Sequence, residues 1–370
     1  MSAPNTAAAR ACDACLRRTW LIAALAGHVE KALSERRRIP QVLALPDADL
    51  IAALAGPHRA QLEAAYDAFD PIDARARTQG LGLQALCRHD SRYPEPLARV
   101  PDAPAVLHCL GGLDRLLELL DAPAVAIVGA RRASPYGLEV AQRLGRGLAG
   151  AGVTVVSGMA LGVDSAAHTG ALESTGTTVA VLGGGAERPY PATKRSLHRA
   201  IAARGAVISE LPPGCHARRW CFPARNRIIA ALAQLTVVVE ATDRSGSLIT
   251  AEFARALGRD VAAVPGRVTS SLARGANALI ADGAHLVSDA QDVLDLLFGV
   301  GAVHARPERD AAQLDAGLRD LLEAVGNGTD TVAALTSAGA DARETLQGLA
   351  ELELLGYVAC REEGRYVPLA

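Results

Sequence analysis

Between residues 124 and 290, one pattern of apolar and polar positions repeats along the chain. Short runs that are apolar throughout end near a glycine and lead into helix-length segments. Strands without polar alternation are covered on both faces, which is typical of parallel sheets flanked by helices. The candidate strands lie at 124–130, 153–159, 177–185, 205–211, 235–241, 260–266 and 284–290. The pattern predicts an α/β fold with a doubly wound, mostly parallel, Rossmann-like sheet.

The flanking segments follow other patterns. Residues 1–80 are rich in Ala and Leu with a helical period, which predicts an all-α domain of the SAM or helix-hairpin-helix kind. The Rossmann-like core is expected over 81–300, beginning with a proline-rich joint at 87–104, and a charged linker is expected over 301–310. Residues 311–370 contain helix-length segments, a glycine turn and two short strands, which predicts a winged-helix-like domain.

Composition and charge narrow the function classes. The chain has 370 residues, half of them apolar, and a formal net charge of −2, as expected for a globular protein of more than one domain. Residues 123–299 hold 18 Lys and Arg against 13 Asp and Glu, whereas residues 311–370 hold 4 against 10. A nucleic-acid partner would therefore be drawn to the core. No apolar run approaches the ~20 residues that span a bilayer, and the N-terminus lacks a signal pattern. We expect a cytoplasmic protein with no membrane partner.

The seven cysteines predict no cofactor. Their number is odd and they are scattered along the chain, so reduced thiols are expected. Cys12 and Cys15 form a C-x-x-C pair, but no second pair follows at the spacing of a zinc finger. The sequence thus predicts no metal site.

Several strand ends suit anions. Gly129 and Arg131 follow the first strand, and Ser245–Ser247, with Gly246 between the two serines, precede a helix. Backbone N–H groups at helix starts, with cations nearby, bind anions. Lys194 follows a triple-glycine turn, for which a plain turn and an anion site both stay open. The glycines do not fit G-x-G-x-x-G and no acidic residue ends the second strand, which weakens a dinucleotide site.

The stretch "CFPARNRIIAALAQLTVVVEA" at 221–241 places Arg225, Asn226 and Arg227 at the start of an apolar helix. Cations are disfavoured there because the dipole of a helix is positive at its N-terminus. Together with Arg219 and Phe222, these residues can form a basic surface with a ring on which a base stacks. The alternative is that the aromatic rings belong to the core and the arginines form a solvated rim.

Asp164 and His168 lie one helical turn apart after the second strand. They could form a metal pair or an acid/base pair. A helix-capping Asp and a His packed inside the fold are the favoured interpretation, because no third ligand or nucleophile has suitable spacing.

Eight motifs now fall in order along the core. They are "VAIVGARRASPYG", "VVSGMALGVDSAAHTGAL", "VAVLGGG…YP", "ISELPPG", "FPARNRIIAAL", "VVVEATDRSGSLITAEFA", "GRDVAAVPG" and "RGANALIADGA". In residues 80–290 the chain resembles the DNA-processing protein A (DprA/Smf) family.

This resemblance implies a function. Members of the family bind and protect single-stranded DNA that enters a competent cell during natural transformation. They load a RecA-type recombinase for DNA recombination, displace single-strand-binding protein, act as homodimers and are not known as enzymes.

The resemblance also implies site residues. The phosphate-binding loop would comprise Gly129, Arg131 and the turn at Ser157 and Gly158. The implied basic and stacking surface consists of Arg219, Phe222, Arg225, Asn226 and Arg227, and the groove is completed by Ser245, Gly246 and Ser247. The chain departs from the family pattern at Ala130, Lys194 and Ala273. Ala130 and Ala273 each remove a hydroxyl, whereas Lys194 adds a cation and is counted as a DNA contact.

Other functions remain open. A nucleotide phosphoribohydrolase on a related core would carry P-G-G-x-G-T-x-x-E with a catalytic Glu, and "VPGRVTSSLARG" does not supply it. A dinucleotide-dependent oxidoreductase would carry a dinucleotide-binding fingerprint, which this chain lacks.

In the C-terminal domain, the second helix carries Glu344, Glu351 and Glu353, which would repel phosphates, so a structural or protein-interaction role is expected.

Overall fold

The computed structural model describes residues 11–34, 42–174, 176–305, 314–337, 341–355, 357–361 and 364–368. The chain divides into two compact units, Met1–Val303 and His304–Ala370.

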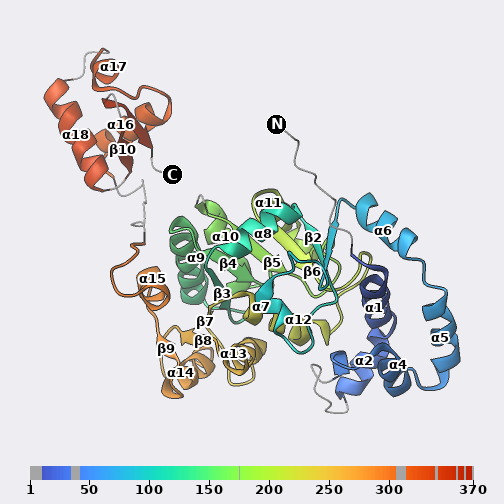
Figure 1. Cartoon of the computed structure of the whole chain (residues 1–370). Coiled ribbons are helices and arrows are strands. Elements are labelled where there is room, and N and C mark those ends of the chain that lie inside the picture. The colour runs from blue at the N-terminus through green and yellow to red at the C-terminus, as the bar shows by residue number, and fades with distance from the viewer. Residues whose placement is uncertain are drawn as a thin grey trace. The chain divides into compact units, whose positions relative to one another are not determined.

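Within the described residues, the first unit is built on a nine-stranded sheet of order β1-β2-β6-β5-β4-β3-β7-β8-β9 (Figure 1). The strands are β1 (Gln84–Cys87), β2 (Val106–Leu110), β3 (Ala124–Val128), β4 (Thr154–Ser157), β5 (Thr178–Val181), β6 (Ala206–Ser209), β7 (Leu235–Val238), β8 (Asp260–Ala263) and β9 (His285–Leu286). Strands β3 to β9 are parallel and coincide with the seven predicted strands. Strands β1 and β2 extend the sheet in antiparallel fashion, and the sequence pattern did not predict them. The predicted mostly parallel, doubly wound sheet is confirmed.

Helices cover both faces of this sheet. One face carries α9 (Pro135–Gly150), α10 (Val163–Glu173) and α11 (Arg195–Arg204), which follows the short 3₁₀ helix η2 (Ala192–Lys194), and α15 (Ala290–Phe298) packs against α9. The other face carries α7 (Glu95–Ala98), α8 (Leu113–Asp121), α12 (Cys221–Leu232), α13 (Gly246–Ala256) and α14 (Arg274–Ala281). The chain changes face through α12, because β7 pairs with β3 on the side opposite β4. The strand order therefore reverses between β3 and β7.

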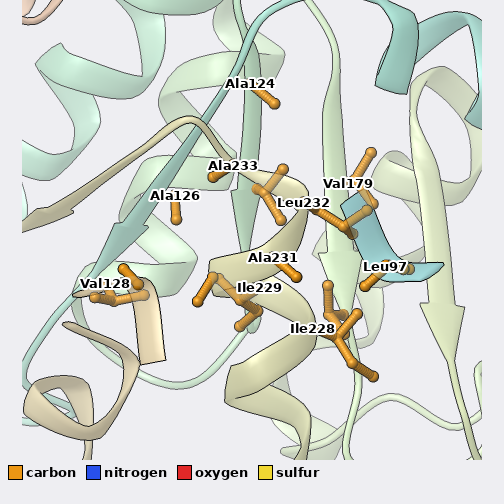
Figure 2. Packing of buried hydrophobic residues seen from close by; sticks show 14 of the residues in the cluster. Leu97, Ala124, Ala126, Val128, Val179, Ile228, Ile229, Ala231, Leu232 and Ala233 are labelled. Atoms are coloured by element: carbon orange, nitrogen blue, oxygen red, sulfur yellow. The ribbon is translucent and has the colours of Figure 1, made fainter. Parts of the chain in front are cut away.

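Helix α12 lies at the centre of the hydrophobic core on its face of the sheet. Ile228, Ile229 and Leu232 are at most 5% exposed, and Figure 2 shows them beside Val128 and Val179 of the sheet. Fully burying one such side chain contributes about 1.5–3 kcal/mol. The small residues of the "IIAALA" run let this helix lie close to the strands, which fixes the position of its first turn.

The N-terminal segment is helical, as predicted. It contains α1 (Asp13–Ala24), α2 (Ala26–Ser34), α4 (Asp47–Leu54), the 3₁₀ helix η1 (Gly56–His58), α5 (Arg59–Asp67) and α6 (Pro71–Gly80). Leu21, Leu25 and Leu50 share a hydrophobic cluster with Trp220, which is 1% exposed. Trp220 therefore joins the N-terminal helices to the start of α12 and offers no face to a base.

The second unit contains the predicted short elements. Helices α16 (Ala316–Gly326), α17 (Val332–Thr336) and α18 (Ala342–Leu354) precede an antiparallel pair, β10 (Val358–Cys360) and β11 (Tyr366–Pro368). Three helices and a hairpin are what a winged helix requires, and that assignment stays a prediction. In the part of the chain that is described, none of the helices has the length and apolar character needed to cross a membrane.

Candidate functional site

A pocket of about 680 Å³ opens where the strand order reverses between β3 and β7. Its walls are the loop after β3, the loop after β4, the first turns of α12 and the loop that starts α13, with Tyr190 and Leu272 at the edge. In open α/β sheets, ligands bind at the carboxyl ends of the strands at such a reversal. We call this cavity the switch-point pocket.

A cation and two aromatic rings meet at the pocket. The guanidinium carbon of Arg131 lies 4.7 Å from the ring centroid of Phe222, a cation–π contact. The ring of Tyr190 lies 5.2 Å from that of Phe222, centroid to centroid. Phe222 is half-buried and Tyr190 is 48% exposed, so Phe222 is not a core residue and aromatic surface faces solvent. Arg219 also lines the pocket and is exposed.

Arg225 lies deeper in the same pocket and is 5% exposed. Its guanidinium donates to the carbonyls of Gly158, at 2.7 Å, and Val181, and its Nε donates to Asn226 Oδ1 at 3.1 Å. Within the described chain, it forms no ion pair with a carboxylate. Burial lowers the pKa of this guanidinium to about 10, against the opposing charge of Asp164. Among the described residues, Arg225 thus feels the charge of Asp164 but has no carboxylate within ion-pair distance.

Arg227 has the opposite surroundings, and its expected place on the basic wall is wrong. It is 2% exposed and donates to Asp102 Oδ2 at 2.7 Å and to both carboxylate oxygens of Glu210, at 2.9 and 2.7 Å. Burial alone would lower the pKa of Arg227, but Glu210 and Asp102 raise it. This buried ion-pair network fixes α12 to the segments that hold the two carboxylates.

The loop after β3 is held by Glu240, two residues beyond the end of β7. The Ala130 N–H donates to the Glu240 carbonyl at 2.7 Å, while the N–H and Oγ of Ser134 donate to its carboxylate at 2.8 and 2.6 Å. A Cβ at Gly129 would lie 2.6 Å from Val163, so only glycine fits there. The start of α9 is thus not the open anion site that the sequence suggested, because a carboxylate of the protein already lies against it.

The start of α13 closes the opposite wall. Ser245, Gly246 and Ser247 all line the pocket, and the Ser245 Oγ accepts from the Ser247 N–H at 3.4 Å. Asn226 donates to the Gly246 carbonyl at 3.1 Å, which links α12 to this wall. The helix therefore directs its N-terminal end, where the dipole is positive, toward the pocket.

Four predicted site residues do not line the pocket: Ser157, Gly158, Lys194 and Arg227. The Ser157 hydroxyl is buried and donates to the Ile127 carbonyl at 2.6 Å, so it joins two strands. Gly158 leaves the space that the Arg225 side chain occupies, because a Cβ at position 158 would lie 2.1 Å from its guanidinium. Lys194 is half-buried at the end of η2, outside the lining.

Asp164 and His168, both on α10, have separate partners in the structure. His168 is fully buried, and its Nδ1 lies 2.7 Å from the Thr178 Oγ1. Burial lowers its pKa to about 3, so the ring is neutral. Asp164 lines the pocket and accepts a hydrogen bond from the Ala160 N–H at 3.4 Å, and burial raises its pKa. The interpretation of His168 as a packed residue is confirmed. That of Asp164 as the helix cap is wrong, because Gly162 is the N-cap residue of α10 and the Asp164 carboxylate accepts from the loop before it.

Sequence reasoning missed Tyr190, Arg132 and Asp164 as lining residues. The rarity of aromatic residues, which make up 3% of the chain, was a usable signal for Tyr190. Nothing in the sequence indicated that Cys87 and His89 lie beside Cys12 and Cys15, because the two pairs are far apart in the chain.

The chain matches a known protein family. The model of the family described as DNA recombination-mediator protein A matches residues 84–298. A Mycobacterium tuberculosis relative is 45% identical over 303 residues, which cover 80% of this chain and 74% of the relative. The DNA processing protein DprA of Streptococcus pneumoniae is 44% identical over 205 residues, covering 55% and 71% of the two chains.

Two solved structures share the architecture. The X-ray structure of DNA processing protein A from Streptococcus pneumoniae aligns with a TM-score of 0.60 at 35% identity, covering 76% of this chain and 95% of that one. A structure of DNA processing protein A from Helicobacter pylori, described by its single-stranded DNA binding mode, aligns with a TM-score of 0.52 at 30% identity. That match covers 58% of this chain and 95% of the other.

Proposed function

Because the chain belongs to the DNA recombination-mediator protein A family, we propose that it binds single-stranded DNA in the switch-point pocket and acts as a recombination mediator. The strand would pass along the mouth of the pocket, with a phosphate near Arg225 and a base against Phe222. Arg131 and Arg219 would contact the neighbouring phosphates.

Arg225 carries this proposal. A buried charge is costly unless it is paired, and buried arginines in proteins normally bind carboxylates, as Arg227 does two residues later. Arg225 instead has backbone carbonyls and an open pocket in front of it. An incoming phosphate is the partner that this arrangement lacks.

The aromatic pair favours single-stranded nucleic acid over a free anion. Single strands bind to grooves that combine cations for the backbone with rings on which bases stack. Phe222 and Tyr190 supply such rings beside Arg131. Duplex DNA keeps its bases stacked inside the helix and would leave these rings unused.

We propose that the protein is not an enzyme at this site. Within the described lining of the pocket, the one carboxylate is Asp164, and the hydroxyls of Ser245 and Ser247 bond to each other at 2.7 Å. Among the described residues, no histidine or glutamate lines the pocket to act as a base for a nucleotide phosphoribohydrolase. From the family we also propose that the protein acts as a homodimer, displaces single-strand-binding protein and loads a RecA-type recombinase, in the cytoplasm.

The test is the binding of labelled oligo-dT, followed by fluorescence anisotropy across a salt series. For single strands, log affinity falls with log salt by about 0.7 per phosphate contact. Arg131→Ala should weaken binding and reduce this slope by about 0.7. Arg77→Ala removes an exposed arginine that pairs with Asp73 on α6, and serves as the matched control. Binding without salt dependence, or hydrolysis of a free nucleotide, would refute the proposal.

A further inference from the structure

Four metal-ligating side chains from two distant segments converge at the start of the helical region. Cys12 and Cys15 lie at the beginning of α1, whereas Cys87 ends β1 and His89 follows it. One ligand atom from each lies within 4.8 Å of all the others. The His89 Nδ1 lies 3.4 Å from the Sγ of Cys12 and 3.4 Å from the Sγ of Cys15. We propose that these residues bind one structural zinc ion.

The spacing fits a tetrahedral site. With Zn–S bonds of about 2.3 Å and Zn–N bonds of about 2.0 Å, a sulfur and a nitrogen on one zinc lie about 3.5 Å apart. Both distances to His89 have this value within a small error. Three cysteines and one histidine are a common set for structural zinc, and four protein ligands leave no open position for a substrate.

The backbone holds the ligands in place independently of any ion. Cys12 is the N-cap residue of α1, and Cys15 lies three residues later on the same side of the first turn. Cys87 pairs with Val106 in the sheet, and the Asp90 N–H donates to the Cys87 carbonyl at 2.9 Å, which folds His89 back. Cys15, Leu16, Cys87 and Val106 also belong to one hydrophobic cluster.

A single ion fits better than a cluster or a disulfide. Cysteines that hold an iron–sulfur cluster bind different iron atoms and so lie further apart than four groups confined within 4.8 Å. A disulfide would involve only two of the three sulfurs and would not explain why the third cysteine and the histidine lie beside them. Zinc uses all four groups, and the three thiolates with Zn²⁺ would carry a net charge of −1 beside the cation Arg88.

The surroundings suit a structural role. Cys15 and Cys87 are buried and His89 is exposed, so the ion would be shielded on one side and reachable on the other. A pocket of about 470 Å³ that is lined by Cys15, Arg88 and His89 offers a path for the hydrated metal. The ion would tie the start of α1 to the edge of the sheet, across more than seventy residues of chain. It takes no part in the switch-point pocket.

Metal analysis of the purified full-length protein tests the proposal. We expect one zinc per chain, together with a native mass that exceeds the apoprotein mass by one zinc ion less the protons it displaces. Cobalt(II) added to apoprotein should give the absorption of a tetrahedral, thiolate-bound ion. His89 is exposed, so His89→Ala should fold and bind zinc at least tenfold more weakly in competition with a chelator, and Cys87→Ser should retain none.

Cys360→Ser is the matched control, because Cys360 is an exposed thiol in the second unit. It should retain one zinc. A chelator should lower the Tm of the wild-type protein by several degrees and leave that of Cys87→Ser unchanged. The proposal is overturned if the wild-type protein binds neither zinc nor cobalt, if its mass reveals a disulfide between these cysteines, or if Cys87→Ser binds zinc as tightly as Cys360→Ser.

Discussion

The guanidinium of Arg131, in the loop after β3, lies over the ring of Phe222, in the first turn of α12, 4.7 Å from its centroid, and both line one pocket. Phe222 thus both orients a cation and offers a face for a base. Stacking of one base on an aromatic ring is worth about 1–3 kcal/mol. Phe222→Ala should therefore weaken oligo-dT binding about tenfold to hundredfold in anisotropy titrations.

Two comparisons make this prediction specific. Phe222→Trp should retain most of the affinity, since the ring persists. Phe298→Ala removes a ring on α15, outside the pocket, and should bind as the wild type does. Wild-type affinity in Phe222→Ala would show that no base stacks at this ring.

Substitutions of Arg225 and Arg227 should affect different properties: the first mainly the affinity for DNA, the second mainly the free energy of unfolding. Arg227→Met leaves Asp102 and Glu210 buried without their cation, which costs about 3–5 kcal/mol in the free energy of unfolding. Arg225→Met leaves two carbonyls unsatisfied, at about 1–3 kcal/mol, and removes the proposed phosphate contact. Urea unfolding should rank Arg227→Met as the less stable variant, whereas oligo-dT titration should rank Arg225→Met as the weaker binder by tenfold or more. The reverse ranking would contradict both assignments.

Compared with an apolar residue at the same position, His108 should lower the free energy of unfolding. This loss should grow as the pH falls. Its ring is 1% exposed, and neither nitrogen has a hydrogen-bond partner among the described residues. Burial lowers its pKa to about 4, from an ordinary value near 6.5. Between these two values the unfolded chain binds a proton that the folded protein does not, so stability falls as the pH falls.

His108→Leu removes both effects. At pH 7.5 it should raise the free energy of unfolding by about 1–2 kcal/mol, because no buried polar group is left unpaired. Its advantage should then grow by up to about 1.4 kcal/mol for each pH unit between 6 and 4. Urea unfolding at several pH values measures this difference. An advantage that does not change with pH would show that His108 does not titrate as described.

The second unit should contribute little to single-strand binding. The acidic residues Glu344, Glu351 and Glu353 of α18 are all exposed, and phosphates would be repelled by them. Deletion of residues 305–370 should leave the affinity for oligo-dT within a few-fold of the wild type. A loss of a hundredfold or more in the same titration would contradict this prediction.

The sheet could be predicted because buried parallel strands are apolar throughout, and this signal is local. Strands β3 to β8 carry it, whereas the two residues of β9 are exposed and were predicted from the longer run 284–290 that contains them. Strand β1 has four residues and an exposed first position, and β2 contains His108, so neither has a distinctive pattern. Their pairing depends on a contact across the proline-rich joint, which no local pattern reports.

The site was predicted less completely, because the missing information lies far away in the chain. Arg225 and Arg227 are the same residue type two positions apart. What distinguishes them is that Arg227 binds Glu210 and Asp102, and Asp102 lies over a hundred residues earlier in the chain. Cys12 and Cys15 likewise lie beside Cys87 only in the folded structure. Motif spacing detects ligands that are neighbours in sequence, and these are neighbours only in space.

Glu240 gives the loop after β3 its shape before any ligand arrives, through its bonds to Ala130 and Ser134. Fixing the backbone of one residue costs about 1–2 kcal/mol of conformational entropy. Because this loop is already ordered in the folded protein, the loss of its conformational entropy accompanies folding and does not weaken DNA binding. The encounter with a strand can then proceed as a single bimolecular step, accelerated by the exposed arginines, with an observed rate that rises in proportion to protein concentration.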